Sequence, residues 1–324
     1  MKLNTIFCVA GAILLNIAGC LGQSDVCGQA PLNTKIIGGQ NATAGSWPWQ
    51  ASIHELSTGR FYFTGTLINK DCSYQCGFII VKIKLTCIYS INVSDIVIYL
   101  GRLTQNGSNP HEISRTVTQI KHPNYNSLGY SLALFQLSSS VNFTDYIRPV
   151  CLAAAGSEFP AGTESWVTGW GSISAEGEKH LLQLPDILQE VENPVVDNTE
   201  CNNSYGGIIT DKLICAGFLN EGGKAPCRRD FGSPLLIRQG SVWIQFGVAV
   251  FSRGCGLPGY PAVYIRVSEY QDWISNYTSS NEPGFVSYPI VPVIVSVLDG
   301  GSVNVLSFSI ALTFSIIPLI LHFF

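Results

Sequence analysis

Short apolar segments, separated by Gly, Pro and Asn, fill residues 36–278, and this pattern constrains the fold more than any other feature. Several of them, such as "SDIVIYLG", "SWVTGWGS", "SVWIQFGVAVF" and "AVYIRV", have the β-branched and aromatic composition of strands. One segment, 268–278, instead predicts a helix that Ser268 would cap. Its predicted apolar face consists of Tyr270, Trp273, Ile274 and Tyr277. Many short strands followed by one helix predict an all-β fold built of barrels or a sandwich.

Both ends of the chain are apolar, which predicts secretion and a membrane tether. Lys2 precedes the apolar run "IFCVAGAILLNIAGC", so residues 1–22 are predicted to be a signal peptide. Residues 304–324 are long enough for a bilayer, which needs about 20 apolar residues. The small residues of "LDGGS" before this tail, with no Lys or Arg after it, favour a glycolipid (GPI) anchor signal. A single C-terminal membrane span is the alternative, and either one places the protein outside the cell at its surface.

Composition limits the partners and cofactors. The net charge of −4 leaves no basic excess, so nucleic acid is not an expected partner. Of eleven cysteines, Cys8 and Cys20 fall in the signal segment, and the remainder predict disulfides with at least one thiol left over. Cys72 and Cys76 have the spacing of half a zinc site, but no His lies near them, so no metal and no other cofactor is expected. Predicted glycosylation sequons begin at Asn41, Asn92, Asn106, Asn142, Asn202 and Asn276.

Several motifs resemble the trypsin/chymotrypsin family of serine proteases. "KIIGGQNATAGSWPWQASI" is similar to the activation site and mature start of that family, and "IRPVCL", "SWVTGWG", "ITDKLICAG" and "GYPAVYIRV" are similar to its second barrel. The layout resembles the membrane-anchored, tryptase- and prostasin-like branch. The resemblance implies two packed six-stranded antiparallel β-barrels with a cleft between them, a C-terminal helix, and protein or peptide partners. The expected parts are a signal peptide (1–22), an activation propeptide (23–35), the protease domain (36–278), a proline-rich irregular linker (279–303) and the apolar tail (304–324).

The resemblance also implies a pattern of disulfides. The implied pairs are Cys27–Cys151, Cys201–Cys215 and Cys227–Cys255. One family bridge is missing at both ends, where Ser165 and Ile237 stand, and another has lost one end to Phe63. The pairing of Cys72, Cys76 and Cys87 stays open, and so does a disulfide-linked dimer.

The Ser–His–Asp triad implied by the resemblance is absent at all of its positions. After "GTLIN" the chain lacks the family's "TAAHC" histidine, and the alternation of Val81, Ile83 and Leu85 with lysines predicts a strand there. Ser131 stands at the aspartate of the "DIALL" motif, and Phe231 at the serine of "GDSGGP". A phenyl ring can neither attack a carbonyl nor donate a proton. Loss of such a nucleophile or base costs on the order of a million-fold in turnover, so the sequence predicts a protease homologue without peptidase activity.

The remainder of the implied cleft is altered as well. Arg229 replaces a glycine whose N–H forms the oxyanion hole, at a cost of about 1–2 kcal/mol if the backbone there needs a positive φ. Ala225 stands where trypsin-like enzymes carry a pocket-floor aspartate. Ser252 and Ala262 replace glycines of the pocket walls, so their side chains are expected to project into it.

No other residue is expected to restore the chemistry. Ser233 comes two positions late and precedes a proline, and Asp145 reads as solvated. The remaining histidines before the tail are interpreted as loop or surface residues: His54, His111, His122 and His180. The "DFG" that begins at Asp230 lacks the other motifs of a kinase.

Parts of an activation device are retained. The Lys35–Ile36 bond is a site that an activating trypsin-like protease would cut, and Asp230 is the carboxylate that would pair with the new amine of Ile36. Buried, this pair would hold the surrounding loops in their mature form. The alternative is that both are relics of ancestry.

Residues 71–90 differ from the family as one block, whereas the sequence on either side matches it smoothly. A retained intron or a misjoined exon is therefore an alternative origin of this block. On that alternative the protein would be an active trypsin-like endopeptidase only if the separate changes at Phe231, Arg229 and Ala225 were also compensated.

Overall fold

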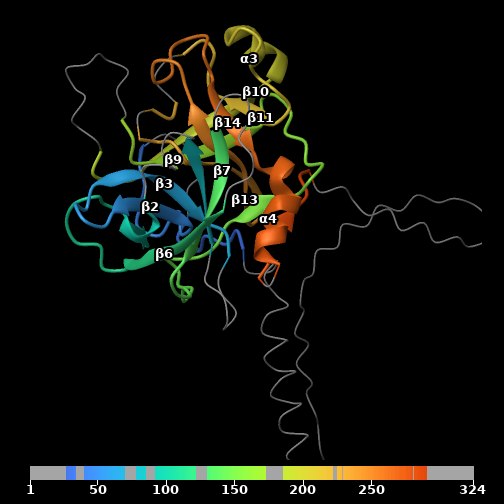
Figure 1. Cartoon of the computed structure of the whole chain (residues 1–324). Coiled ribbons are helices and arrows are strands. Elements are labelled where there is room, and N and C mark those ends of the chain that lie inside the picture. The colour runs from blue at the N-terminus through green and yellow to red at the C-terminus, as the bar shows by residue number, and fades with distance from the viewer. Residues whose placement is uncertain are drawn as a thin grey trace, which may run out of the picture.

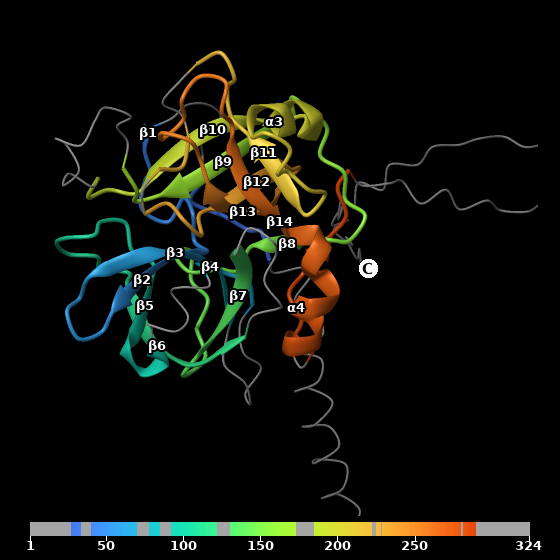
Figure 2. The same ribbon diagram turned by 45° about the horizontal axis from the view of Figure 1, so that its top comes forward.

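The computed structural model describes residues 27–33, 40–69, 78–84, 92–121, 130–172, 185–221, 225–227, 229–279 and 281–289. These residues form two β-barrels packed against each other, with a helix lying beside both (Figures 1 and 2). The predicted all-β class, the pair of barrels and the C-terminal helix are confirmed.

The first barrel is a closed ring in the order β2-β3-β4-β7-β6-β5. Its strands are β2 (Gln50–Glu55), β3 (Phe61–Leu67), β4 (Phe78–Lys84), β5 (Ile96–Leu100), β6 (Ile113–Lys121) and β7 (Tyr130–Leu137). A short 3-10 turn, η1 (Val93–Asp95), precedes β5. Ile53, Ile98 and Leu134 are fully buried in the core of this barrel. The alternation of apolar residues along each strand puts these side chains inside.

The strand β4 lies within the unusual block 71–90, where the sequence predicted a strand. It pairs with β3 on one side and with β7 on the other, where Ile83 faces Ser131. The strand prediction is confirmed for Val81 to Lys84, whereas Leu85 lies outside the described residues. The block therefore supplies one of the strands that close the first barrel.

The second barrel closes in the order β12-β9-β10-β11-β14-β13, because β12 also pairs with β13. Its strands are β9 (Glu164–Gly169), β10 (Gln189–Val196), β11 (Leu213–Ala216), β12 (Pro234–Gln239), β13 (Val242–Phe251) and β14 (Ala262–Arg266). Two short strands extend it beyond β13: β8 (Cys151–Ala153) pairs with β13, and β15 (Phe285–Val286) pairs with β8. Both pairings are parallel. A further short strand, β1 (Gln40–Asn41), pairs with β10.

Tryptophan side chains join the barrels. Trp47, just before β2, packs edge-on against Trp243 of β13 with ring centroids 4.8 Å apart. Its indole N–H also donates to a carboxylate oxygen of Glu190 in β10 at 2.7 Å. Buried aromatic pairs contribute about 0.5–1.5 kcal/mol beyond their area burial. This contact therefore helps to hold the two barrels together.

The C-terminal helix is present but begins later than predicted. Residues Val267–Tyr270 form a 3-10 turn, η3, and the α-helix α4 runs from Gln271 to Thr278. The prediction that Ser268 caps the helix is wrong, because that residue lies inside the 3-10 turn. Ile274 is fully buried as predicted, but Tyr277 is 37% exposed.

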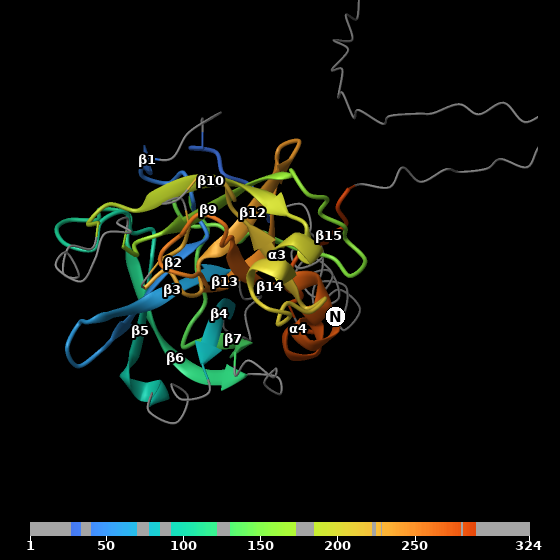
Figure 3. The same ribbon diagram turned by 90° about the horizontal axis from the view of Figure 1, so that it is seen from above.

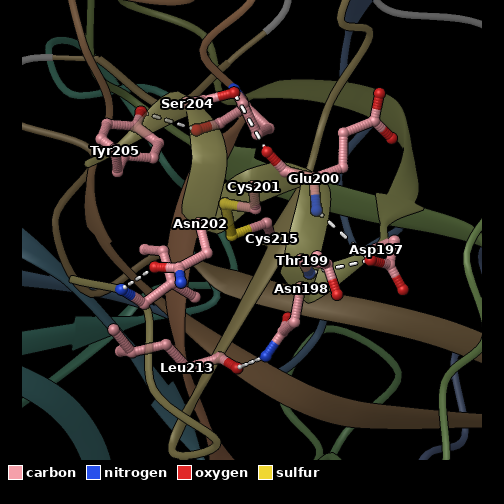
Figure 4. Close-up of a disulfide and its surroundings, with 12 residues drawn as sticks. Asp197, Asn198, Thr199, Glu200, Cys201, Asn202, Ser204, Tyr205, Leu213 and Cys215 are labelled. Carbon is pink, nitrogen blue, oxygen red and sulfur yellow. Dashed lines mark hydrogen bonds between the residues drawn. A yellow bond between two sulfur atoms is a disulfide. The ribbon is translucent and has the colours of Figure 1, made fainter. Parts of the chain in front are cut away.

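A second helix, α3 (Asn198–Ser204), was missed by the sequence analysis. It is too short and polar for a periodic apolar face, and a cap and a disulfide stabilise it instead (Figure 4). The Asp197 carboxylate accepts hydrogen bonds from the N–H groups of Thr199 and Glu200. Cys201 ties the helix to Cys215 of β11. In the view from above (Figure 3) α3 and α4 overlap along the line of sight, but Figures 1 and 2 show them well apart, with α3 beside β11 of the second barrel.

The chain after α4 docks on the second barrel. We call residues 281–289 the C-terminal strap. It contains the strand β15 (Phe285–Val286), which pairs with β8, and the Tyr288 ring stacks on Phe159 with centroids 5.0 Å apart. The expectation of irregular structure throughout 279–303 is therefore corrected here, since backbone pairing and ring stacking outweigh the local effect of the prolines.

Among the described residues, no helix is long and apolar enough to cross a membrane. The predicted signal peptide (1–22) and apolar tail (304–324) lie outside the described residues.

Candidate active-site cleft

Phe231 lies where the barrels meet. Its carbonyl accepts a hydrogen bond from the N–H of Thr64 in β3 at 3.3 Å, and the N–H of the next residue, Gly232, donates to Ala249 of β13 at 3.1 Å. The turn is thus bonded to the first barrel and to the second. Its phenylalanine side chain is 40% exposed. An exposed aromatic ring thus occupies the position at which the family resemblance implies a serine hydroxyl.

Asp230 is buried directly behind this turn, at 8% exposure. Its carboxylate accepts hydrogen bonds from the N–H groups of Gly171 at 2.7 Å and Cys227 at 2.9 Å. Burial raises the pKa of Asp230 to about 7, although these hydrogen bonds act in the opposite direction. A Cβ on Gly171 would lie 2.2 Å from the carboxyl carbon, so only glycine leaves room for it there. Lys35 and Ile36 lie outside the described residues, so their pairing with Asp230 stays a prediction.

Arg229 has a positive φ of 73°, in the left-handed region. This is the condition under which the sequence analysis expected a cost of about 1–2 kcal/mol for a residue with a Cβ. The arginine side chain is exposed. The strain and the added cation both lie next to Phe231, at the position that resembles an oxyanion-hole glycine.

Two segments that the family resemblance assigns to the walls of a substrate pocket are joined to each other. The Ser252 hydroxyl donates to the Pro226 carbonyl at 2.6 Å, and the Cys227–Cys255 disulfide links the same two segments. Ala262 is buried in β14, where it pairs with Ala216, and Ala225 packs against the core of the second barrel. None of these wall residues carries a negative charge. No carboxylate therefore stands at Ala225, Ser252 or Ala262 to bind the cation of a Lys or Arg side chain.

The other triad positions lie on strands or outside the described residues. Ser131 is in β7, paired with Ile83 of β4. The segment in which a catalytic histidine would be sought, 71–77, lies outside the described residues. Ser233 is fully buried, and its hydroxyl would be 2.7 Å from a Cβ placed on Gly169. Because that hydroxyl points into the protein, Ser233 does not present a nucleophile to the cleft.

The histidines differ in their surroundings. The interpretation of His54 as a loop or surface residue is wrong, because it lies in β2 at 4% exposure. The sequence carried only a weak signal for this, the two-residue spacing that puts His54 and Ser52 on one face of a strand. His111 is exposed and stacks on Tyr146 with centroids 3.5 Å apart. His122 and His180 lie outside the described residues.

Asp145 forms an exposed ion pair with Arg148 at 2.9 Å. Exposed pairs of this kind contribute little to stability. The carboxylate of Asp145 is therefore engaged by Arg148 at the surface, as its interpretation as a solvated residue implied.

Within the part of the chain that the structure describes, the three disulfides that the resemblance implied are present. Cys27 is joined to Cys151, and both are fully buried, as are Cys201 and Cys215. At the missing bridge, Ser165 and Ile237 are both buried, one step further along the register that pairs Leu236 with Trp166. Phe63 fills its position by packing against Phe135 of β7 with centroids 6.2 Å apart. Ser165 and Ile237 thus occupy the position of one missing bridge, and the packing of Phe63 replaces one end of the other.

The sequon asparagines lie mainly at the surface. The exposed ones are Asn41, Asn92, Asn106, Asn142 and Asn276. Asn202 is half-buried at the end of α3, and its side-chain oxygen accepts from the N–H of Ile209 at 2.8 Å. Glycosylation of these asparagines stays a prediction. The described residues contain no cluster of metal-binding side chains.

Comparison with known proteins supports the family that the motifs resemble. The Trypsin family model matches residues 36–274. Transmembrane protease serine 5 of Homo sapiens is 33% identical over 253 residues, which cover 76% of this chain and 52% of that protein. The chain thus spans about half the length of the relative that it matches.

Proposed function

Since this chain belongs to the trypsin family of serine proteases, we propose that it is a member that binds proteins or peptides without hydrolysing them. The observation that carries the proposal is Phe231, an exposed ring at the position of the nucleophile, in a turn bonded to each barrel. Acyl transfer needs a hydroxyl or thiol that a base can deprotonate. The phenyl ring has neither group.

The surroundings of Phe231 support the loss of activity independently. Arg229 adds a side chain to the oxyanion-hole position, and the hydrogen bond between Ser252 and Pro226 joins the pocket walls. Substrate binding and oxyanion stabilisation account for the residual rate of proteases that lack a triad member. With both altered, the expected rate falls below even that residual rate.

A covalent active-site probe tests the proposal. The full-length protein, cut after Lys35 with a trypsin-like protease and then freed of it, is incubated with a fluorescent phosphonate that labels activated serines. We expect no labelling and no turnover of fluorogenic Lys or Arg peptides. An active trypsin-family enzyme taken through the same steps is the positive control. Stoichiometric labelling of this chain would overturn the proposal in favour of an active endopeptidase.

The variant Phe231→Ser separates the loss of the nucleophile from the other changes. We expect it to stay unlabelled, because the block 71–90 supplies no histidine to activate the new hydroxyl. The partner-binding half of the proposal has its own test. Proteins retained by the immobilised chain should be recovered intact, and retention should fall when Phe231 is replaced by Asp. Cleaved fragments in the eluate, or equal retention by the variant, would count against it.

We further propose that the protein is tethered outside the cell, with residues 304–324 acting as a GPI-anchor signal or a membrane span. The disulfides and the exposed sequon asparagines support an oxidising, extracellular setting. Release of the protein from intact cells by a phosphatidylinositol-specific phospholipase would identify the anchor. Retention after that treatment, with extraction only by detergent, would identify the span.

A further inference from the structure

One face of β2 carries a buried polar cluster on the far side of the strand from the barrel core. Ser52 and His54 are 0% and 4% exposed, and the Ser52 oxygen lies 2.7 Å from His54 Nε2. Arg102 Nη1 approaches the same ring nitrogen at 3.2 Å. His54 Nδ1 lies 2.9 Å from the carbonyl oxygen of Gly59. All of these groups are closer to the imidazole than a water layer would allow.

These contacts fix the protonation state of the ring. A carbonyl oxygen only accepts hydrogen bonds, so Nδ1 carries the proton that is donated to Gly59. In the neutral imidazole Nε2 is then an acceptor, and it accepts from the Ser52 hydroxyl and from Arg102. A guanidinium cannot accept a hydrogen bond. Protonation at Nε2 would therefore turn the contact with Arg102 into two N–H groups and two positive charges facing each other.

Arg102 begins a segment that is bonded to the second barrel. The carbonyl of Leu103 accepts from the indole N–H of Trp170 at 3.0 Å and from the N–H of Leu188 at 2.9 Å. Two residues later, the N–H of Gln105 donates to the carbonyl of Asp186 at 2.8 Å. Movement of Arg102 would thus strain hydrogen bonds that join the two barrels.

We propose that His54 is an acid-sensitive switch: its protonation expels the Arg102 guanidinium and loosens residues 102–106 from the second barrel. Burial is the main reason that the pKa of His54 is lowered, and Arg102 lowers it further, so the switch operates below about pH 6.5. Glu112, which forms an ion pair with Arg102 at 2.5 Å, acts in the opposite direction and raises the pKa of His54. The rings of Tyr99 in β5 and Phe61 in β3 pack against the imidazole, the first edge-on and the second tilted.

Hydrogen exchange of the full-length, detergent-solubilised protein tests this inference. The amides of Gln105 and Leu188 report on the bonds between the barrels. After correction for the intrinsic rate, we expect them to exchange about tenfold faster at pH 5.5 than at pH 7.5, as for a local opening that protonation favours. In His54→Gln, which does not titrate, that acid response should disappear.

Three further variants keep the test decisive. His111→Gln removes a surface histidine and should retain the full response. Asp186→Asn removes the carboxylate that accepts a hydrogen bond from the N–H of Asn106. In this variant the acid response at the Leu188 amide should remain. If His54→Gln fails to fold, Arg102→Gln decides instead, because without the facing cation the acid response should be lost. The inference is overturned by equal exchange at both pH values, or by an acid response that survives in His54→Gln or Arg102→Gln.

Discussion

The Ser252 hydroxyl donates a hydrogen bond to the Pro226 carbonyl, and this contact joins two segments that the family resemblance assigns to the walls of a substrate pocket. The Cys227–Cys255 disulfide holds the same walls at a fixed spacing. We infer that these contacts narrow the pocket that the resemblance implies, independently of the loss of the nucleophile.

Reopening the pocket should restore binding of a cation without restoring catalysis. In the triple variant Ala225→Asp, Ser252→Gly and Ala262→Gly, the walls lose their side chains and the floor gains a carboxylate. We expect benzamidine, a planar cation, to bind the variant with a Kd on the order of 1 mM and the parent not at all. Titration followed by NMR measures this. Ala225→Asp alone is the control, and equal benzamidine binding by the parent would show that the pocket is open already.

Replacing Arg229 should relieve the backbone strain. At its φ of 73°, Gly avoids the Cβ clash that Ala and Arg share. We expect Arg229→Gly to be more stable than Arg229→Ala by about 1 kcal/mol, measured as the free energy of unfolding in urea. The alanine variant is the matched control, because it removes the cation and keeps the strain. If alanine proves as stable as glycine, the left-handed backbone is not strained.

Asp230 should give stability an unusual dependence on pH. Its pKa in the folded protein, about 7, is above the value near 3.9 of an unfolded aspartate, so the folded state binds more protons between these values. Its contribution is full below about pH 4 and is lost as the pH rises towards 7. The difference in melting temperature between the parent and Asp230→Asn should therefore change across this window. His54, whose lowered pKa acts in the opposite direction, cancels because both proteins contain it.

The exposed Asp145→Asn serves as the control for that measurement and should follow the parent curve across this window. The same measurement can be repeated on protein that has been cleaved after Lys35. If the new amine of Ile36 reaches Asp230, the cleaved protein should lose the fall in stability between pH 4 and 7, because the carboxylate gains a cation. An unchanged curve after complete cleavage would favour the alternative that the activation device is a relic.

The C-terminal strap should stabilise the second barrel. Tyr288 stacks on Phe159, which in turn stacks on Phe246 with centroids 4.2 Å apart. We expect Tyr288→Ala to lower the free energy of unfolding by about 1–2 kcal/mol, whereas Tyr288→Phe, which keeps the ring, should change it by less than about 0.5 kcal/mol. Thermal melts of the three proteins give the comparison. Equal melting temperatures would mean that the strap is only loosely attached.

Much of the fold was predictable because local patterns carry it. The strand composition around Ile98 and Ile244 and the apolar spacing in α4 follow from burial of one face, and the strand at Val81–Lys84 was visible within an otherwise unfamiliar block. The helix α3 was missed because its stability comes from the Asp197 cap and the Cys201–Cys215 bond, which leave no periodic signal. The strand in the strap was missed because its partner, β8, lies far away in the sequence.

The sequence by itself determined the identities of the side chains, and with them the absence of a hydroxyl at Phe231 and of a carboxylate at Ala225, since chemistry of this kind does not depend on folding. Only the tertiary structure decided which groups meet. The left-handed backbone of Arg229, the bond from Ser252 to Pro226 and the burial of His54 against Arg102 each join segments or conformations that no local pattern encodes. The reason is physical: desolvation and hydrogen bonding depend on neighbours in space, and a closed barrel brings together residues that are distant along the chain.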